Sequence, residues 1–366
     1  MTAVTTTRRR FFTAGATSVL ALGTASHANP TGKATVVEGS EHWAHRQAGG
    51  ENIRLFIWRK RLPNLAKTAR KGTILFVHGS SMAGTPVFDL QVPGKPQYST
   101  MDHFARLGFD TWCLDNEGYG RSSKSRPINF DISNGADDLD AVSQYILNKT
   151  GETQIMLYGL SSGALKAALF AERFPERVKR IALDAFVWTG EGSPTLANRR
   201  KRIAEWSSGN KRAIDRAMIE SIFTRDHPGT ADPDVVNAFA SAILKLDFEV
   251  PTGSYVDMSV RLPVCTPEKL KVPTMIMRGE FDGIAGFQDL AKAGATGAQG
   301  VQGVFNSLQK VGLGTEKLAT YMQMVSNNSQ DLAQITGTVN GGLKVFENTM
   351  GGLSKANRIE VQQLGL

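Results

Sequence analysis

The chain has 366 residues, of which 41% are hydrophobic, 21% charged and 8% aromatic. This balance is typical of a globular protein and excludes a disordered, collagen-like or coiled-coil chain. The formal net charge is +8, and three of the positive charges are Arg8, Arg9 and Arg10 at the N-terminus. The rest is thinly spread and no nucleic-acid-binding motif appears, so we expect no nucleic-acid partner.

Residues 7–28 have the three-part pattern of a secretory signal. The arginines precede a short apolar run from Phe11 to Leu22, and small residues follow as far as Ala28. We predict cleavage after Ala28, against the alternative of a merely basic N-terminus. The arginines followed by Phe11 and Phe12 resemble a bacterial twin-arginine signal, which exports folded proteins. The apolar run is too short to span a bilayer stably, so we expect a periplasmic or secreted protein without stable membrane insertion.

From about residue 52 to residue 278, short β-rich runs alternate with helical stretches. The predicted strands are Ile53–Trp58, Thr73–Val77, Asp110–Leu114, Gln154–Tyr158, Val178–Leu183 and Thr274–Met277. The predicted helices are Thr100–Leu107, Gly135–Asn148 and Ser162–Phe174, with Ser133 as the N-cap of the second. Several strand runs are almost continuously hydrophobic, as expected for strands covered on both faces. The alternation predicts an α/β fold with a mostly parallel, doubly wound sheet.

The alternation stops between Gly190 and Pro267. Helical segments are predicted at Leu196–Trp206, Lys211–Phe223 and Pro233–Lys245, and no strand is expected before Thr274. An inserted helical cap is the simplest interpretation. Its charge run Arg199-Arg200-Lys201-Arg202 is more often a solvated helix face than an anion site.

A Gln-rich segment of different composition follows Leu290. Its apolar residues recur at the helical period between glycines, which predicts amphipathic helices and no further strand. One interpretation of this segment is that it mediates self-association.

The chain has two cysteines, Cys113 and Cys265, which excludes a disulfide scaffold and a CxxC metal or redox site. They could pair in an oxidising compartment. The apolar surroundings of Cys113 favour a buried free thiol instead.

The motif Gly159-Leu160-Ser161-Ser162-Gly163 stands between a predicted strand and a predicted helix. A serine on such a tight turn projects its Oγ above the sheet, and small neighbours are needed where the backbone is crowded. Ser161 is therefore the candidate nucleophile.

Three further motifs follow predicted strands. In His78-Gly79-Ser80-Ser81 the N–H of Ser80 can join that of Ser162 as an oxyanion hole, and His78 is interpreted as a residue that holds the loop. Residues 115–122 (DNEGYGRS) are interpreted as a structural turn. In residues 278–283 (RGEFDG) Asp282 is the candidate acid, with Glu280 as the alternative; Asp184 is a weaker candidate after another strand.

These four motifs, in this order and spacing, resemble the α/β-hydrolase family over about residues 50–290. The resemblance implies a nucleophile at Ser161, an acid at Asp282, oxyanion donors at Ser80 and Ser162, no cofactor or metal, and a small-molecule ester substrate. A serine at the nucleophile position argues against the epoxide- and halide-cleaving branches, whose nucleophile is Asp.

The sequence departs from the family pattern in one respect. The family's histidine follows the acid in the chain, and none of the six histidines here follows Asp282. His227, in the predicted cap, is the best substitute base.

Two hypotheses follow. The first is a secreted carboxylesterase-type serine hydrolase without its usual histidine, and the second is a catalytically impaired hydrolase-like domain with a tail for binding or assembly. The expected organisation is a signal over 1–28, a core over 29–189, a cap over 190–267, an acid-bearing core segment over 268–290 and a tail over 291–366.

Overall fold

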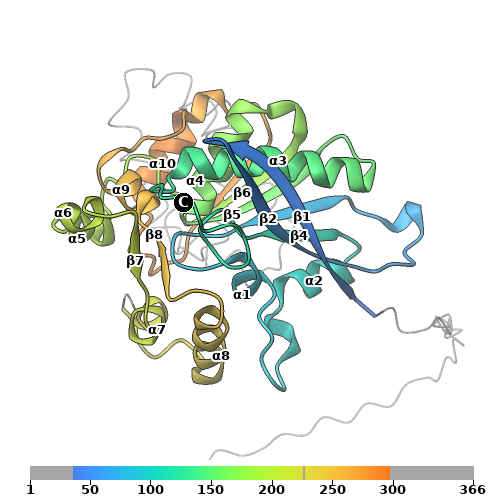
Figure 1. The fold of residues 1–366 in the computed structure, drawn as a ribbon, viewed down its shortest axis with the longest axis horizontal. Helices are drawn as coiled ribbons and strands as arrows, with labels where there is room; N and C mark the ends of the chain where they lie inside the picture. Colours follow the sequence, from blue (N-terminus) through green and yellow to red (C-terminus); the bar gives the residue numbers. More distant parts are fainter. Residues whose placement is uncertain (1–35, 226, 297–366) are drawn as a thin grey trace, which may run out of the picture. The chain divides into compact units, whose positions relative to one another are not determined.

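The computed structural model describes residues 36–225 and 227–296 (Figure 1). The predicted export signal and residues 297–366 of the predicted tail lie outside the described residues.

A seven-stranded sheet with the order β1-β2-β4-β3-β5-β6-β9 forms the centre of the fold. Its strands are β1 (Glu38–Ala48), β2 (Glu51–Arg61), β3 (Thr73–Val77), β4 (Asp110–Leu114), β5 (Ile155–Leu160), β6 (Val178–Asp184) and β9 (Thr274–Met277). The β1–β2 and β2–β4 pairs are antiparallel and every other pair is parallel. This confirms the predicted mostly parallel sheet.

Strand β1 was not predicted. It is an edge strand whose residues are mostly polar and exposed, so it lacks the hydrophobic run that identified the others. Its apolar residues are Trp43, Ala44 and Ala48 besides Gly39, and Trp43 packs edge-on against Phe56 of β2 at a ring distance of 5.2 Å.

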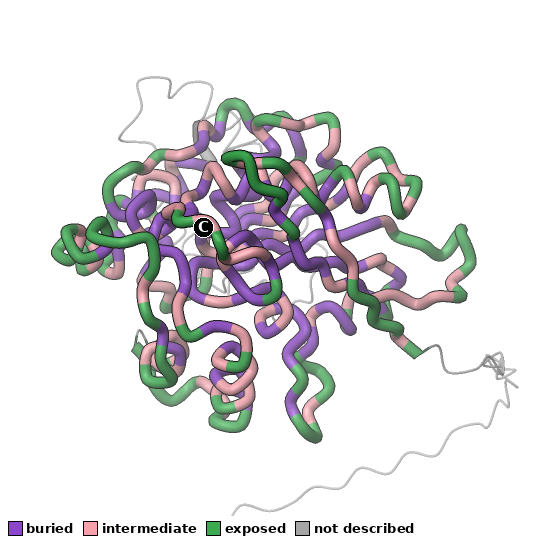
Figure 2. Tube along the Cα trace, viewed as in Figure 1, coloured by how far each residue is buried: buried purple, intermediate pink, exposed green. Residues whose placement is uncertain are grey.

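The two faces of the sheet pack against different helices, because successive strand residues point to opposite sides. Leu75 and Val77 of β3 join the cluster formed with α3 (Ile132–Thr150), α4 (Ser162–Arg173) and α10 (Phe287–Thr296). Ile74 and Phe76 join the cluster formed with α1 (Gly84–Phe88) and α2 (Thr100–Arg106). Figure 2 shows the buried trace concentrated in the strands between these layers. Single 3₁₀ turns occur at Lys67–Ala69, Pro96–Tyr98, Pro175–Arg177 and Pro267–Lys269.

The predicted cap of helix α3 at Ser133 is wrong. Asp131 is the N-cap, because its carboxylate accepts the backbone N–H of Asn134 while the Asn134 side chain accepts the N–H of Asp131. Ser133 lies inside the helix, where its hydroxyl accepts a hydrogen bond from Arg173.

Five helices lie between β6 and β9: α5 (Pro194–Arg200), α6 (Ile203–Ser207), α7 (Arg216–Thr224), α8 (Pro233–Leu244) and α9 (Gly253–Val260). We call residues 190–267 the cap segment. The expectation of no strand there is wrong, since β7 (Lys211–Ala213) pairs with β8 (Glu249–Pro251). These strands are only three residues long, which is too short for a periodic pattern to predict them. The helix predicted to begin at Lys211 begins at Arg216.

Helix α10 extends beyond residue 290, where the tail was predicted to begin. The buried carboxylate of Asp289 accepts the backbone N–H groups of Trp188, Thr189 and Gly190, which ties α10 to the chain leaving β6. Within the described residues, no helix is long and apolar enough to cross a membrane.

Candidate active site

Ser161 occupies a sharp turn between β5 and α4. Its backbone has φ 57° and ψ −123°, a conformation that non-glycine residues rarely adopt. The turn is possible only because its neighbours lack side chains: a Cβ on Gly163 would lie 2.1 Å from the Val77 carbonyl oxygen, and one on Gly159 would lie 2.5 Å from the Gly163 carbonyl oxygen. The two glycines of the motif are thus a steric requirement of this turn.

The loop after β3 lies beside Ser161. A Cβ built on Gly79 would be 3.9 Å from Ser161 Oγ. The next residue is Ser80, and Ser162 begins helix α4. Neither of their backbone N–H groups donates a hydrogen bond to another group in the described part of the chain.

His78 is fully buried beneath this loop. Its Nδ1 lies 2.8 Å from the Gly79 carbonyl oxygen, and its Nε2 accepts the backbone N–H of Asn116 at 3.0 Å. Burial and the charge of Lys166 hold the pKa of His78 well below its usual value. Both ring nitrogens are therefore engaged in joining two loops, and neither can take a proton from Ser161.

The turn over residues 115–122 is held by internal bonds. Asp115 accepts the backbone N–H groups of Gly84 and Arg121. Glu117 accepts both Arg46 and Arg126. Both carboxylates are buried and accept hydrogen bonds from other groups of the fold.

Two of the three candidate acids follow β9, and the third ends β6. Asp282 accepts the backbone N–H groups of Ile284 and Ala285 at 2.7 and 3.2 Å, which fixes the loop around it. Glu280 is exposed. Asp184 accepts the hydroxyl of Tyr158, and burial raises the pKa of its carboxyl group.

One cavity of about 630 Å³ collects the predicted site residues. We call it the Ser161 cavity. Its lining includes Ser80, Ser161, Asp184, His227, Glu280 and Asp282. The lining also includes Arg199, Arg225 and Tyr255 from the cap segment.

His227 lies at this cavity on the loop that follows α7. Its ring is stacked on that of Phe281 at a centroid distance of 3.8 Å and an interplanar angle of 5°. The ring nitrogens make no hydrogen bond in the described part of the chain, and Phe281 directly precedes the candidate acid Asp282. The structure thus brings this histidine to the cavity that holds Ser161.

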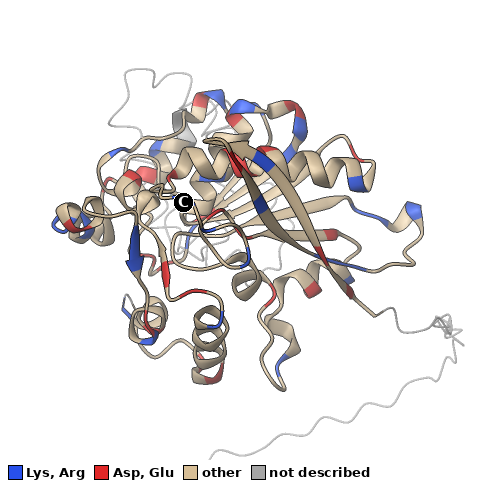
Figure 3. Cartoon of the chain, in the orientation of Figure 1, with Lys and Arg blue, Asp and Glu red and all other residues tan. Residues whose placement is uncertain are grey.

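The cap wall of the Ser161 cavity contains residues that the sequence did not single out. Tyr255 of α9 lies between two guanidinium groups, with Arg199 at 3.8 Å and Arg212 at 3.9 Å from its ring centroid. Arg212 also donates to the Ser80 carbonyl and to Ser81 Oγ, both at 2.8 Å. Interpreting Arg199 as part of a solvated helix face was therefore wrong, whereas Arg200, Lys201 and Arg202 are exposed as expected. Figure 3 shows basic positions in blue in the α5–α6 region and on β7.

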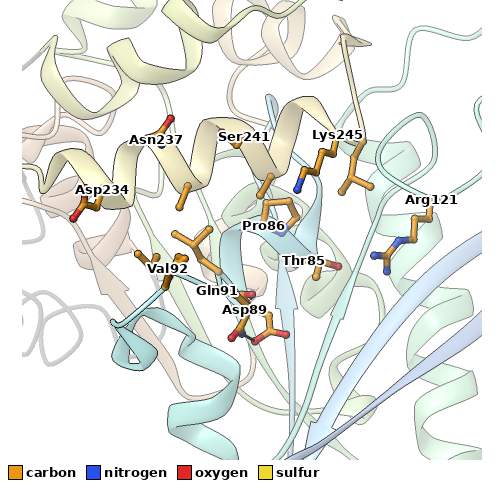
Figure 4. A pocket seen from close by; sticks show the side chains of 15 residues that line it. Thr85, Pro86, Asp89, Gln91, Val92, Arg121, Asp234, Asn237, Ser241 and Lys245 are labelled. Carbon is orange, nitrogen blue, oxygen red and sulfur yellow. Dashed lines mark hydrogen bonds between the residues drawn. The ribbon is translucent and has the colours of Figure 1, made fainter.

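A larger cavity of about 850 Å³ lies between α8 and the segment from α1 to residue 93 (Figure 4). Asp89, Arg121 and Lys245 are among its lining residues. Neither Ser161 nor any other residue of the four motifs except Arg121 lines it, so it is not the candidate site.

Within residues 36–225 and 227–296, no group of three or more His, Cys, Asp or Glu side chains could hold a metal ion. Cys113 and Cys265 are buried free thiols, and burial raises the pKa of Cys265 to about 12. Such thiols are poor nucleophiles and poor ligands.

A family model described as the alpha/beta hydrolase fold matches residues 72–286. No curated protein matches the sequence. A hydrolase from Pseudomonas aeruginosa is similar in structure, with a TM-score of 0.51 and 17% identity over 70% of this chain and 87% of that chain. A thermophilic esterase from Thermogutta terrifontis has a TM-score of 0.48 and 20% identity over 78% and 99% of the two chains. An epoxide hydrolase from Vigna radiata has a TM-score of 0.49 and 16% identity over 71% and 88%.

Proposed function

The chain belongs to the α/β-hydrolase family, and we propose that it is a serine hydrolase that cleaves carboxylic esters through Ser161. The observation that carries this proposal is the strained backbone of Ser161 between two glycines that admit no side chain, at the wall of a cavity. A strained serine at the end of a parallel strand is the feature of a nucleophile elbow. Because this position holds serine and not aspartate, the proposal is ester cleavage and not epoxide opening.

In this proposal Ser161 Oγ attacks the ester carbonyl carbon, and the carbonyl oxygen becomes an oxyanion. The unpartnered N–H groups of Ser80 and Ser162 would donate to that oxygen, aided by the positive end of helix α4. The alcohol leaves with a proton, and water then attacks the acyl group on Ser161 and regenerates the serine.

We assign the proton transfer to His227, oriented by the carboxylate of Asp282. Its support is that His227 lines the cavity of Ser161 and that its ring nitrogens make no hydrogen bond among the described residues, whereas both nitrogens of His78 are hydrogen-bonded. Catalytic hydrogen bonds are often absent before substrate binds, so the free ring of His227 fits this role.

The test of the nucleophile is turnover of 4-nitrophenyl acetate by the wild type and by Ser161→Ala. Losing the nucleophile of such a triad costs about 10⁴-fold or more in kcat. Ser208→Ala, an exposed serine of the cap segment, is the matched control and should keep full activity. Equal rates for the wild type and Ser161→Ala would exclude the serine mechanism.

The test of the base compares His227→Ala with His103→Ala, an exposed histidine on α2. Loss of a general base lowers kcat by about 10²–10⁴-fold, so His227→Ala should fall in that range while His103→Ala stays near the wild type. A Ser161-dependent rate that survives His227→Ala unchanged would remove His227 from the mechanism.

The second candidate function is a hydrolase-like domain with impaired catalysis and a tail for binding or self-association. It is favoured by one sequence observation: no histidine lies between Asp282 and residue 366. The segment 297–366 lies outside the described residues. An inactive wild type with an intact fold would support this candidate.

We further propose that residues 1–28 export the protein to the periplasm or the medium by the twin-arginine route. The support is the order of arginines, apolar run and small residues. Replacing Arg8 and Arg9 with Lys should abolish export of the folded protein, and N-terminal sequencing of the exported form should begin at Asn29. An unchanged periplasmic yield would argue against this route.

A further inference from the structure

The cap wall of the Ser161 cavity carries concentrated positive charge. Arg199, Tyr255 and Arg212 form a stack in which the phenol ring lies between the two guanidinium groups. Burial lowers the pKa of the Arg199 side chain, and the nearby charges of Arg212 and Arg225 lower it further. Arg199 and Arg225 line the cavity, and Arg212 contacts the Tyr255 ring beside them, so positive charge is gathered at the cap wall.

The stack leaves donors unused. The Nη1 atom of Arg199 and the Nε atom of Arg212 are buried and have no hydrogen-bond partner among the described residues. Neither side chain forms an ion pair with a carboxylate in that part of the chain. A buried guanidinium N–H without a partner is unfavourable, so a bound anion that accepts from it would bind tightly.

The carboxylates of the cavity lie on other elements. Asp184 ends β6, and Glu280 and Asp282 follow β9, whereas Arg199 belongs to α5 and Tyr255 to α9. The Asp184 carboxylate is bonded to Tyr158, and Asp282 accepts two backbone N–H groups. Asp184 and Asp282 are therefore already engaged, whereas Arg199 and Arg212 have donors without a partner among the described residues.

We propose that Arg199, supported by Tyr255 and Arg212, binds a carboxylate group of the substrate, so that the enzyme prefers esters carrying a carboxylate remote from the scissile bond. This inference rests on the proposed ester hydrolysis at Ser161. The planar fork of a guanidinium matches the two oxygens of a carboxylate, which is why this anion is assigned to the wall.

The experiment compares two aryl esters that differ by one charge: mono-4-nitrophenyl adipate and its methyl-capped form, methyl 4-nitrophenyl adipate. The readout is the ratio of kcat/KM for the anionic ester to kcat/KM for the neutral one. In the wild type we expect a ratio of about ten or more, because a charge-assisted hydrogen bond to the carboxylate should lower KM for the anionic ester.

Arg199→Met should lower this ratio about tenfold. The matched control is Arg202→Met, which removes the same charge from an exposed cap residue paired with Glu205 and should keep the wild-type ratio. Should Arg199→Met fail to fold, Arg199→Gln keeps polarity without charge and serves the same comparison. A wild-type ratio near one, or an equal decrease in both variants, would overturn the proposal.

A binding measurement separates this inference from the proposed function. Monomethyl adipate should raise the melting temperature of the wild type and of Ser161→Ala, and should not raise that of Arg199→Met. If neither ester shows Ser161-dependent turnover while this pattern holds, ester hydrolysis is wrong and the carboxylate site stands. If monomethyl adipate gives no shift in the wild type, the carboxylate site is wrong.

Discussion

The two sides of the Ser161 cavity are built in different ways. On the sheet side, backbone and buried side chains leave almost no freedom. A Cβ on Gly163 would lie 2.1 Å from the Val77 carbonyl oxygen and 2.6 Å from that of His78, and both ring nitrogens of His78 make internal hydrogen bonds. On the cap side, His227 is exposed, and Arg199 reaches the cavity from a short helix. The sheet side fixes the position of Ser161, and the cap side supplies charge through side chains that can change without altering the core.

A buried ionic network makes the sheet side rigid. Lys166 of α4 donates to Asn116 at 2.9 Å, and Asn116 also donates to Asp138. Arg46 binds both Asp138 and Glu117. A Cβ on Gly135 would lie 2.5 Å from the Lys166 side chain, so the absence of a side chain at this position of α3 leaves room for the lysine.

The largest effect expected from this contrast is on stability. Gly163→Ala places a methyl group 2.1 Å from the Val77 carbonyl oxygen, and the neighbouring backbone must move. We expect a loss of more than about 3 kcal/mol in the free energy of unfolding, measured by denaturant titration. Gly209→Ala in the cap segment is the control, because its nearest contact would be at 3.9 Å and it should change stability by less than about 0.5 kcal/mol. An equal loss of unfolding free energy at Gly163 and Gly209 would mean that the sheet side is no more tightly constrained than the cap side.

The second prediction concerns the pH dependence of stability. Burial lowers the pKa of Lys166 to about 7, whereas an unfolded lysine titrates near 10.5. Between these values the unfolded chain binds more protons than the folded one, so the free energy of unfolding rises with pH and is lowest at and below pH 7. A single group contributes at most about 1.4 kcal/mol per pH unit across this window.

Lys166→Met should remove that contribution to the slope between pH 7 and pH 10. Lys149→Met, an exposed lysine on α3, should leave the slope as in the wild type. The check is chemical denaturation at several pH values, and an unchanged slope in Lys166→Met would mean that the lysine stays charged in the core.

The sequence predicts the sheet side far better than the cap side. Strands β3, β4 and β9 have the predicted bounds, because buried parallel strands are short, continuous hydrophobic runs. The turn at Ser161 is also a local feature, since its constraint comes from Gly159 and Gly163, two residues away on either side. Local signals of this kind are what a sequence pattern can contain.

The cap wall depends on contacts between distant residues. Arg199 and Tyr255 are 56 positions apart, and α9, which carries Tyr255, has no strong apolar periodicity. Nothing in the run Arg199–Arg202 distinguishes the one arginine that turns inward from its exposed neighbours. His227 could be named as a candidate from the sequence, but its place at the cavity follows from the path of the whole cap segment.

The smallest effect expected is a pH dependence of the anion preference. Burial opposes ionisation of Tyr255, but Arg199 and Arg212 outweigh it and lower the pKa of the phenol to about 8. Above that pH a phenolate would stand between the two guanidinium groups and compete with the substrate carboxylate for their charge. The ratio of kcat/KM for the two adipate esters should therefore fall, by at least about threefold, between pH 7 and pH 9.

Taking a ratio cancels the titration of any group that acts on both esters, so the decrease reports the cap wall alone. Tyr255→Phe keeps the ring between the arginines and removes the ionisable hydroxyl, so its ratio should stay constant over the same range. Tyr98→Phe changes an exposed tyrosine that does not line the Ser161 cavity, and should behave like the wild type. A constant wild-type ratio would mean that the phenol does not ionise beside the bound carboxylate. The same decrease in Tyr255→Phe would mean that a group other than this phenol titrates near the bound carboxylate.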